Sequence, residues 1–233
     1  MKAIILAAGR GVRMRPYTHL TPKPLLKING KRIIDHTLSI LPQEVDEIII
    51  VVGHRKWRIK KYLGNSYKGK KITYISQKDK KGTAHALYLC KPYLRKKEKF
   101  LIVFGDDIYT EKDLKRCIQY PLSILAAEVE NPSAFGVLKF NKDRHLEEII
   151  EKPKDNPPSN LVVCGVFVLS HKIFKYRMQA IDNKEFGLPQ TIMKMAKKHP
   201  IKIIKASFWL PIGYPKDLKK AKEVMFANNN NIS

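Results

Sequence analysis

The side chains with the clearest chemical meaning lie near the N-terminus. Gly9 and Gly11 form a turn, and Arg13 follows it directly. Glycine has no Cβ, so the main-chain N–H groups of such a turn can come within hydrogen-bonding distance of a phosphate or a base. Lys23 comes ten residues after Arg13, between two prolines whose restricted backbone stiffens the loop. A cation on a rigid loop beside a glycine turn predicts a bound polyphosphate.

Two common phosphate-binding motifs do not fit this turn. The P-loop pattern GxxxxGK[ST] is absent from the sequence, and in the dinucleotide pattern GxGxxG the third glycine falls at Met14. The strand that we expect at residues 47–52 is followed by Gly53, His54 and Arg55, so it offers no carboxylate for a ribose hydroxyl. The sequence therefore excludes the P-loop and the dinucleotide-binding motif.

The composition predicts a soluble globular protein. With 233 residues, 44% of them apolar, the chain can bury a sizeable core as one large domain or as a domain with a small elaboration. It has no apolar run of membrane-spanning length, and its short N-terminal apolar run leads straight into the glycine turn, unlike a signal peptide. We therefore expect a cytoplasmic protein without a membrane partner. Cys90, Cys117 and Cys164 are isolated, which favours buried free thiols over a zinc site.

The charge is strongly positive, since 45 Lys and Arg against 21 Asp and Glu give a net charge of +24. A basic surface attracts nucleic-acid backbones, so a nucleic-acid partner has to be weighed. The basic residues are spread in short clusters over almost every expected helix and loop, and no aromatic-rich strand face accompanies them. This pattern favours a solvated lysine surface, which can steer anionic substrates, and makes nucleic acid an unlikely partner.

Alternating strands and helices predict the fold. In the first half we expect strands at 3–8, 47–52, 71–76 and 100–104 and helices at 32–41, 55–63 and 82–89. Such alternation is typical of a Rossmann-like, doubly wound α/β fold with a mixed, mostly parallel sheet and ligands at the carboxyl ends of its strands. Later we expect strands at 123–129, 136–140, 146–150, 162–169 and 201–206 and helices at 172–180, 188–199 and 215–226. One domain over residues 1–227 and a disordered tail at 228–233 complete the prediction.

The pattern LAAGxGxR, followed by PKPL and a small-residue turn, resembles the sugar-1-phosphate nucleotidylyltransferases of the NTP-transferase family. The resemblance implies an enzyme that transfers a nucleoside monophosphate from a nucleoside triphosphate to a sugar 1-phosphate. It places the nucleotide in residues 1–121 and the sugar in 122–227. We expect a short form of the family, without the hexapeptide-repeat β-helix of some relatives and without acetyltransferase activity. Relatives are commonly oligomers, which leaves a homo-oligomer open.

The pattern Q(x)₄GTA indicates a site for the base. The amide of Gln77 offers a donor and an acceptor, which match the N3–H and O4 of uracil or thymine, and Gly82 allows the backbone to approach the base. In isolation, a helix start with an exposed glutamine is the commoner explanation. The resemblance favours UTP or dTTP, with guanylyl or cytidylyl transfer as an alternative. The nucleotide-binding residues that it implies are Leu6, Ala7, Ala8, Gly9, Gly11, Gln77, Gly82 and Thr83.

A metal site is expected after the strand at 100–104. Asp106 follows Gly105 there, where a carboxylate can bind a Mg²⁺ ion that bridges phosphate oxygens. A Gly–Asp pair alone is about as often a simple turn, but Asp106 occupies the position that resembles the family's metal-binding aspartate. Mg²⁺ is therefore the expected cofactor. Asp107 is a second candidate ligand with less weight.

Further segments resemble the family's sugar-phosphate pocket, although by themselves Glu151 and Lys152 form an ordinary strand exit. The resemblance implies that Glu151 accepts hydrogen bonds from sugar hydroxyls, that Lys152 binds the sugar phosphate, and that the backbone at Gly136 reaches the sugar. Relatives that use N-acetylglucosamine 1-phosphate often have Asn where this chain has Val163. A plain hexose such as glucose 1-phosphate is therefore slightly favoured.

The charges of the reactants suggest the mechanism. A sugar 1-phosphate brings its own nucleophilic oxygen, so the protein has to bring two anions together and stabilise the departing pyrophosphate. We assign the pyrophosphate to Arg13, the sugar phosphate and the α-phosphate to Lys23, and Mg²⁺ to Asp106.

One position departs from the family. Relatives read W-x-D-I-G-T-P near the C-terminus, with the Asp or Asn as a second metal ligand, whereas this chain reads WLPIGYP with Pro211. Proline has no side-chain ligand, so either Asp106 holds the metal with phosphates and waters, or the site is impaired. The alternative function is a catalytically weak regulatory relative that binds a nucleotide sugar. Because Arg13, Lys23 and Asp106 are retained, the sequence favours the enzyme.

Overall fold

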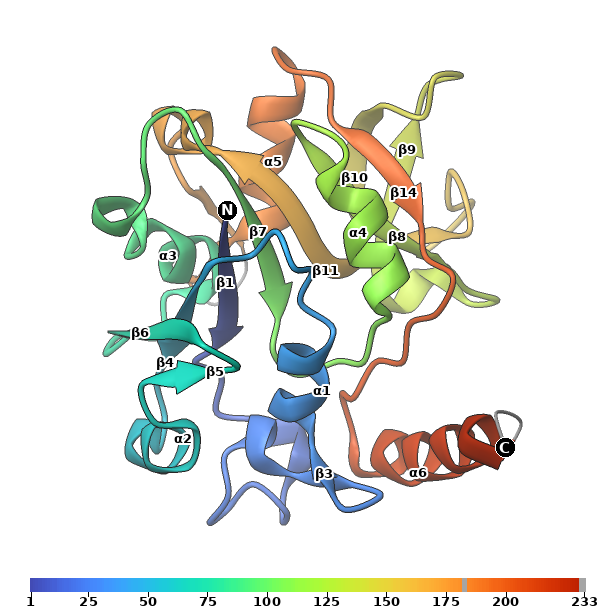
Figure 1. The fold of residues 1–233 in the computed structure, drawn as a ribbon. Coiled ribbons are helices and arrows are strands. Elements are labelled where there is room, and N and C mark those ends of the chain that lie inside the picture. The colour runs from blue at the N-terminus through green and yellow to red at the C-terminus, as the bar shows by residue number, and fades with distance from the viewer. Residues whose placement is uncertain (182–183, 231–233) are drawn as a thin grey trace.

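Strand β1 (Lys2–Ala7) lies at the centre of a ten-stranded mixed sheet (Figure 1). The computed structural model describes residues 1–181 and 184–230, the last five by their backbone alone. β1 pairs in parallel with β4 (Glu47–Val52) on one edge and with β7 (Lys99–Phe104) on the other, and β4 pairs in parallel with β6 (Lys70–Ser76). This arrangement confirms the predicted Rossmann-like α/β class with a mixed sheet.

The second half of the chain extends the same sheet with antiparallel strands. β11 (Leu161–Ser170) pairs with β7, with β8 (Ser123–Glu128) and, at one residue, with β9 (Gly136–Phe140). β9 pairs with β10 (Leu146–Glu151), and β14 (Lys202–Lys205) runs parallel to β8. Because β11 contacts strands of both halves, the two expected halves share one sheet. Short β5 (Ser66–Tyr67) pairs with β6 at the end of this sheet, and two separate two-stranded sheets are formed by β2 (Lys27–Ile28) with β3 (Lys31–Arg32) and by β12 (Gln179–Ala180) with β13 (Phe186–Gly187).

Helices cover both faces of the sheet, which is why β1 is apolar on both sides. α1 (Ile33–Ser39), α2 (Lys56–Leu63) and α4 (Glu111–Ile118) pack on the face that carries Ile5. α3 (Gly82–Tyr88) and α5 (Leu188–Ala196) pack on the face that carries Ile4. α6 (Pro215–Asn230) lies apart from both layers, below the sheet in Figure 1, and covers a third core with Ile28 of β2.

The predicted helix at 172–180 is wrong. The chain forms a 3₁₀ turn at His171–Lys175 and then the short strand β12. The hydroxyl of Tyr88 donates to the carbonyl oxygens of Ile173 and Tyr176. A continuous helix would use the carbonyl of Ile173 for its own hydrogen bonds. Tertiary contacts therefore replace the helix that local pattern predicted.

Helix α4 has no counterpart in the sequence prediction, although it carries a start signal. Thr110 precedes it, and the Thr110 hydroxyl accepts a hydrogen bond from the backbone N–H of Asp113. This is the usual N-cap contact. The other predicted strands and helices of the chain are present with ends shifted by a few residues.

The C-terminal helix is longer than expected. α6 continues past Phe226, where we expected it to end, through Asn230. Residues 228–230 of the expected disordered tail are therefore helical, and residues 231–233 of that tail lie outside the described residues.

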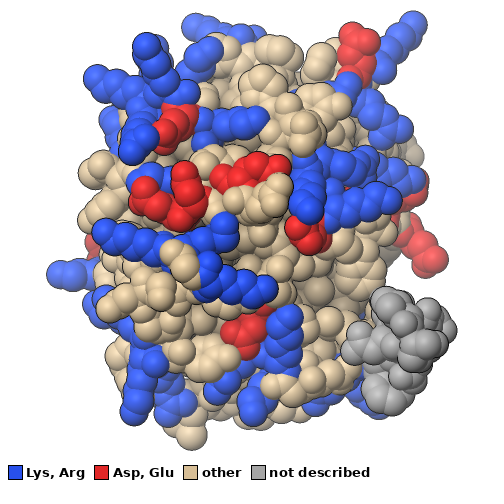
Figure 2. Space-filling model, in the orientation of Figure 1, with Lys and Arg blue, Asp and Glu red and all other residues tan. Residues whose placement is uncertain are grey.

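Two surface properties bear on the expected partners. In the part of the chain that the structure describes, no helix has both the length and the apolar character needed to cross a membrane. Figure 2 shows Lys and Arg side chains over most of the visible face, with Asp and Glu side chains between them. The positive charge on this face is therefore distributed and does not form one basic stripe.

A buried carboxylate joins α4 to the chain that follows β14. Asp113 has no exposed surface, and its Oδ2 accepts hydrogen bonds from the backbone N–H of Ser207 at 2.8 Å, from the Ser207 hydroxyl at 2.9 Å and from the Thr110 hydroxyl at 3.0 Å. Arg116 pairs with its other oxygen at 3.2 Å. Asp113 thus fixes the start of the segment that leads to the C-terminal side of the site.

We expect Asp113→Ala to lower the free energy of unfolding by about 3 kcal/mol, because buried donors lose their charged acceptor. Urea denaturation followed by circular dichroism measures this loss. Glu111→Ala removes an exposed carboxylate from the same helix and should leave the midpoint nearly unchanged. A loss below about 1 kcal/mol in Asp113→Ala would contradict the role given to this network.

Candidate active site

A cavity of about 1070 Å³ opens among the segments that follow β1, β6 and β7, where parallel strands end at one edge of the sheet. Of the site residues predicted from the sequence, all except Ala7 line it. They are Leu6, Ala8, Gly9, Gly11, Arg13, Lys23, Gln77, Gly82, Thr83, Asp106, Gly136, Glu151, Lys152 and Val163. The fold therefore brings both halves of the predicted site around one space, while the role of each residue stays a prediction.

The glycine turn depends on Gly11. Gly11 has φ +61°, in the left-handed region, and its carbonyl accepts a 2.7 Å hydrogen bond from the Thr18 hydroxyl. A Cβ at position 11 would lie 3.0 Å from Thr18 Cγ2 and 3.3 Å from the Cβ of Lys23. Both the conformation and the space therefore require glycine here.

An ion pair connects the proline-flanked loop to the end of β7. The Nζ of Lys23 lies 2.8 Å from Oδ2 of Asp106, and their side chains are 11% and 40% exposed. These are the predicted catalytic cation and the predicted metal ligand, which lie far apart in sequence. Any cation that binds Asp106 therefore competes with Lys23 for the carboxylate. Binding of that cation would free the Lys23 ammonium group for phosphate oxygens.

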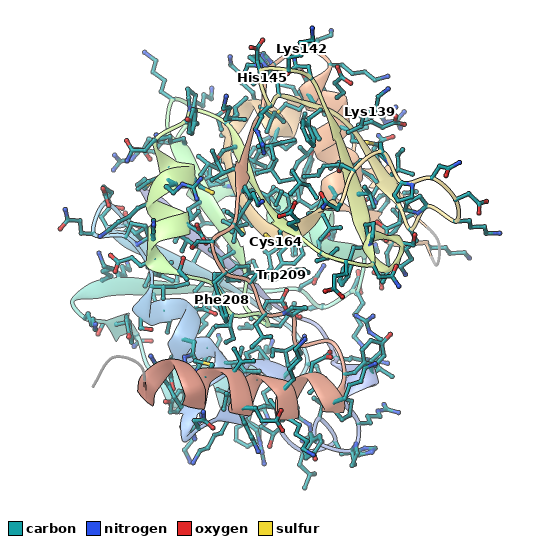
Figure 3. The ribbon with its side chains drawn as sticks, turned by 90° about the vertical axis from the view of Figure 1, so that its right-hand side faces the viewer. Lys139, Lys142, His145, Cys164, Phe208 and Trp209 are labelled. Atoms are coloured by element: carbon teal, nitrogen blue, oxygen red, sulfur yellow. The ribbon has the colours of Figure 1, made fainter. Side chains whose placement is uncertain are left out.

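Asp107, the second metal candidate, also lines the cavity, and both of its side-chain oxygens accept hydrogen bonds within the protein. Its Oδ2 accepts a hydrogen bond from Nε1 of Trp209 at 3.1 Å, and its Oδ1 accepts one from the backbone N–H of Ile212 at 3.0 Å. Burial, and then the charge of Asp106, raises the pKa of Asp107 to about 7. In Figure 3, Trp209 lies between Cys164 of β11 and helix α6. Asp107 thus anchors the C-terminal segment to the end of β7.

The anchored segment presents Tyr214 to Arg13. The guanidinium of Arg13 lies 5.1 Å from the centre of the Tyr214 ring, and its Nη1 donates to the Tyr214 hydroxyl at 3.5 Å. Oδ2 of Asp217 accepts hydrogen bonds from the backbone N–H groups of Gly213 and Tyr214. Tyr214 was not among the site residues predicted from the sequence, although it replaces the threonine of the family pattern. Pro211 lines the cavity and supplies no side-chain ligand.

The amide of Gln77 is held with its oxygen unpaired among the described residues. Its Nε2 donates to the carbonyl of Gly82 at 3.0 Å and lies 3.0 Å from Nδ1 of His85. Burial, helped by Lys81, lowers the pKa of His85, so its ring is neutral at neutral pH and Nδ1 acts as an acceptor. Both hydrogens of Nε2 are then used, and Oε1 remains to accept a hydrogen bond from a ligand.

Gly82 and Thr83 also pack α3 against the chain near β13. Gly82 has φ +83°, and a Cβ there would lie 2.4 Å from the carbonyl oxygen of Phe186. The Thr83 hydroxyl accepts a 2.9 Å hydrogen bond from the backbone N–H of Leu188. Gly82 and Thr83 of the GTA pattern therefore have a role in packing. The sequence predicted a different role for Gly82, which was to let the backbone approach a base.

The predicted sugar-binding residues lie on β9, β10 and β11, with Lys152 directly after β10. A Cβ at Gly136 would lie 3.3 Å from Oε2 of Glu151 and 3.7 Å from Cγ2 of Val163. Oε2 of Glu151 also accepts a 3.4 Å hydrogen bond from the amide of Gln190. Lys152 has φ +45°, which is rare for a residue with a Cβ, and its backbone N–H donates to Phe135. This bend ends β10 at the cavity wall.

The chain is similar to known proteins over nearly its whole length. The chain matches the family model described as nucleotidyl transferase over residues 2–227. The UTP–glucose-1-phosphate uridylyltransferase AglF of Haloferax volcanii is 32% identical over 96% of this chain and 96% of its own length. The bifunctional protein GlmU of Methanocaldococcus jannaschii is 34% identical over 99% of this chain but only 55% of its own length. The chain thus spans about half of that relative.

A solved structure resembles the whole fold. A Bacillus anthracis protein described as a glucose-1-phosphate thymidylyltransferase superposes with a TM-score of 0.86 at 27% identity. The match covers 96% of this chain and 94% of that protein.

Asp107 gives a pH-dependent prediction. Its pKa of about 7 lies above the ordinary value of 3.8, so folding favours the protonated form. This contribution to stability is complete below about pH 4 and is lost as the pH rises through about 7. Asp107→Asn is neutral at every pH and should not show this loss. We therefore expect the stability of the wild type relative to Asp107→Asn to fall between these pH values, as urea titrations in EDTA would measure; a constant difference would contradict the prediction.

Proposed function

Because the chain belongs to the nucleotidyl transferase family, we propose that it transfers a nucleoside monophosphate from UTP or dTTP to a sugar 1-phosphate and releases pyrophosphate. One observation carries the proposal: Lys23 and Asp106 meet at 2.8 Å in the cavity that the glycine turn and Arg13 also line. Two cations beside main-chain N–H groups suit a site for two phosphate-bearing reactants.

The proposed reaction is an in-line displacement. An oxygen of the sugar 1-phosphate forms a bond to the α-phosphorus, and the bond between that phosphorus and the pyrophosphate oxygen breaks. Lys23 would hold the sugar phosphate and the α-phosphate together, which lowers their mutual repulsion. Arg13, held by Tyr214, would bind the departing pyrophosphate.

Mg²⁺ fits the residues present, although they offer few ligands. Asp106 supplies a partly exposed carboxylate in the cavity, whereas Asp107 is engaged and Pro211 has no donor. The described residues contain no group of three or more His, Cys, Asp or Glu that could hold a metal. Mg²⁺ commonly binds through one or two carboxylates with phosphate oxygens and waters. When bound, it would neutralise charge on the phosphates, and Asp106 is the residue that would hold it.

The orientation of Gln77 supports uracil or thymine as the base. With both amide hydrogens used by Gly82 and His85, only Oε1 of Gln77 can contact a base. An acceptor matches the N3–H of uracil and thymine, whereas cytosine has an unprotonated N3 at that place. We therefore prefer UTP or dTTP over CTP.

The sugar is proposed to be a hexose such as glucose 1-phosphate. Val163 stands beside Gly136 and Glu151 in the sugar half of the cavity and offers no hydrogen bond to an acetamido group. The similarity to the bifunctional GlmU proteins makes N-acetylglucosamine 1-phosphate the second candidate. Incubation with each triphosphate and each of these sugar phosphates, with pyrophosphate release as the readout, would decide between them. Binding of a nucleotide sugar without pyrophosphate from any pair would instead indicate a regulatory relative.

Lys23→Ala tests the catalytic assignment. We expect kcat/KM to fall by at least about 100-fold, comparable to the loss of one oxyanion donor, because the repulsion between the two phosphates is no longer offset. Lys27→Ala removes an exposed lysine close by in β2 and serves as the matched control. Equal activity in the two variants, with both folded by circular dichroism, would sink the assignment.

His85→Leu tests the orientation of the amide. Without the acceptor at Nδ1, only the Gly82 carbonyl still holds the orientation of the Gln77 amide, which can then turn its Nε2 toward N3 of cytosine at the cost of that one hydrogen bond. We expect the ratio of kcat/KM for UTP to that for CTP to fall by about tenfold. Because both nucleotides are assayed on one variant, a general loss of stability cancels in the ratio. An unchanged ratio would show that His85 does not set base selectivity.

A further inference from the structure

A second cavity, of about 260 Å³, lies beside the glycine turn. It is lined by Arg10, Arg15, Thr18 and His19 from the loop after β1 and by His54 and Arg55 from the segment between β4 and α2. Arg10 lines both this cavity and the larger one. The proposed transfer reaction assigns no role to the smaller cavity.

The lining is cationic and has no acidic counterpart. It contains three arginines and two histidines and no Asp or Glu. Among the side chains that the structure describes, which exclude those of 182–183 and 226–233, none offers these five side chains a salt bridge or a hydrogen-bond acceptor. Arg13 and Lys23 of the larger cavity, in contrast, contact Tyr214 and Asp106. Three unneutralised guanidinium groups around one hollow repel one another unless an anion lies between them.

Arg55 adds two independent observations. Its Nε is buried without a hydrogen-bond partner, which leaves a charged donor unsatisfied. Its backbone is left-handed, with φ +53° and ψ 33°, at the N-cap of α2. Such a conformation in a residue with a Cβ is uncommon and is concentrated at functional sites.

The size and the lining restrict the ligand. A cavity of 260 Å³ is smaller than those that enclose ligands of nucleotide size. No Phe, Tyr or Trp lines it, so there is no ring on which a base could stack. Burial lowers the pKa of His54, and the charges of Arg55, Arg10 and Arg15 lower it further. The complementary ligand is a compact anion with several charges.

We propose that this cavity is a second anion site, which binds a diphosphate group such as inorganic pyrophosphate separately from the triphosphate cavity. The guanidinium groups of Arg10, Arg15 and Arg55 would bind its oxygens, and the Nε–H of Arg55 would gain its missing acceptor. Arg10 and Arg15 lie on the loop that carries Arg13, and Thr18 bonds the Gly11 carbonyl. An anion here therefore ties the glycine turn to the start of α2.

Calorimetric titration with inorganic pyrophosphate in Mg²⁺-free buffer tests the proposal on the Lys23→Ala chain, in which binding to the larger cavity is weakened. Arg55→Asn removes the charge while keeping a residue that tolerates the left-handed backbone. Arg15→Gln changes an exposed side chain and gives a second variant that should fold. Arg58→Gln, on α2 but outside the lining, is the matched control.

We expect the dissociation constant for pyrophosphate to rise about tenfold in Arg55→Asn and in Arg15→Gln and to stay within about twofold in Arg58→Gln. Unchanged affinity in the first two variants, or no binding by any chain at millimolar pyrophosphate, would overturn the proposal. So would an equal loss of UTP affinity in Arg55→Asn in the wild-type background, because the cavity would then be an extension of the triphosphate site. Since the readout is binding, it remains decisive even if the proposed transfer reaction fails.

The anion has two candidate sources, which are the pyrophosphate released by the proposed reaction and a phosphoanion from solution. Measurements of turnover distinguish them. If the released pyrophosphate passes through this cavity, Arg55→Asn should lower kcat at unchanged KM for the nucleotide. If the cavity takes a phosphoanion from solution, kcat without added anion should equal that of the wild type. Both turnover results agree with a second anion site, provided that Arg55→Asn and Arg15→Gln show the weaker pyrophosphate binding described above.

Discussion

The burial of β1 between two parallel neighbours is the constraint on which the site depends. Because β4 and β7 run in the same direction as β1, the chain must leave all three strands at one edge of the sheet. The glycine turn, the segment at His54 and the pair of aspartates after β7 are therefore neighbours. The close approach is visible at Gly53, where a Cβ would lie 2.4 Å from the carbonyl oxygen of Ala8. Apolar packing on both faces fixes this geometry before any ligand binds.

At that edge, two neighbouring aspartates have different roles. Asp106 is partly exposed and pairs with Lys23, so both groups remain accessible to phosphates and metal. Asp107 is the next residue, but its side chain is only partly exposed and accepts hydrogen bonds from Trp209 and Ile212. Both aspartates lie in the turn after β7, where Asp106 pairs with Lys23 and Asp107 organises the segment that carries Tyr214. Arg13 is thereby positioned by residues from the opposite end of the sequence.

The sequence predicted the fold where local and tertiary preferences agree. The apolar runs of β1, β4 and β7 could only be buried strands, and the glycines after them could only be turns. It failed at residues 172–180, where the Tyr88 hydroxyl takes carbonyls that a helix would need, and at α4, whose Thr110 cap was overlooked. For the site, the motif residues line one cavity, but Tyr214 and His85 carried no motif that would have revealed their contacts.

The sequence by itself determined the class of fold, the family and the set of residues with the chemistry to bind phosphates, because these follow from residue type and short spacing. Only the tertiary structure decided that Asp107 accepts hydrogen bonds from Trp209 and Ile212, that the backbone of Phe186 leaves no room for a Cβ at Gly82, and that three arginines surround a second cavity. Those facts depend on which distant segments meet. Burial, hydrogen-bond partners and local potential are set by neighbours in space, and sequence spacing does not specify them.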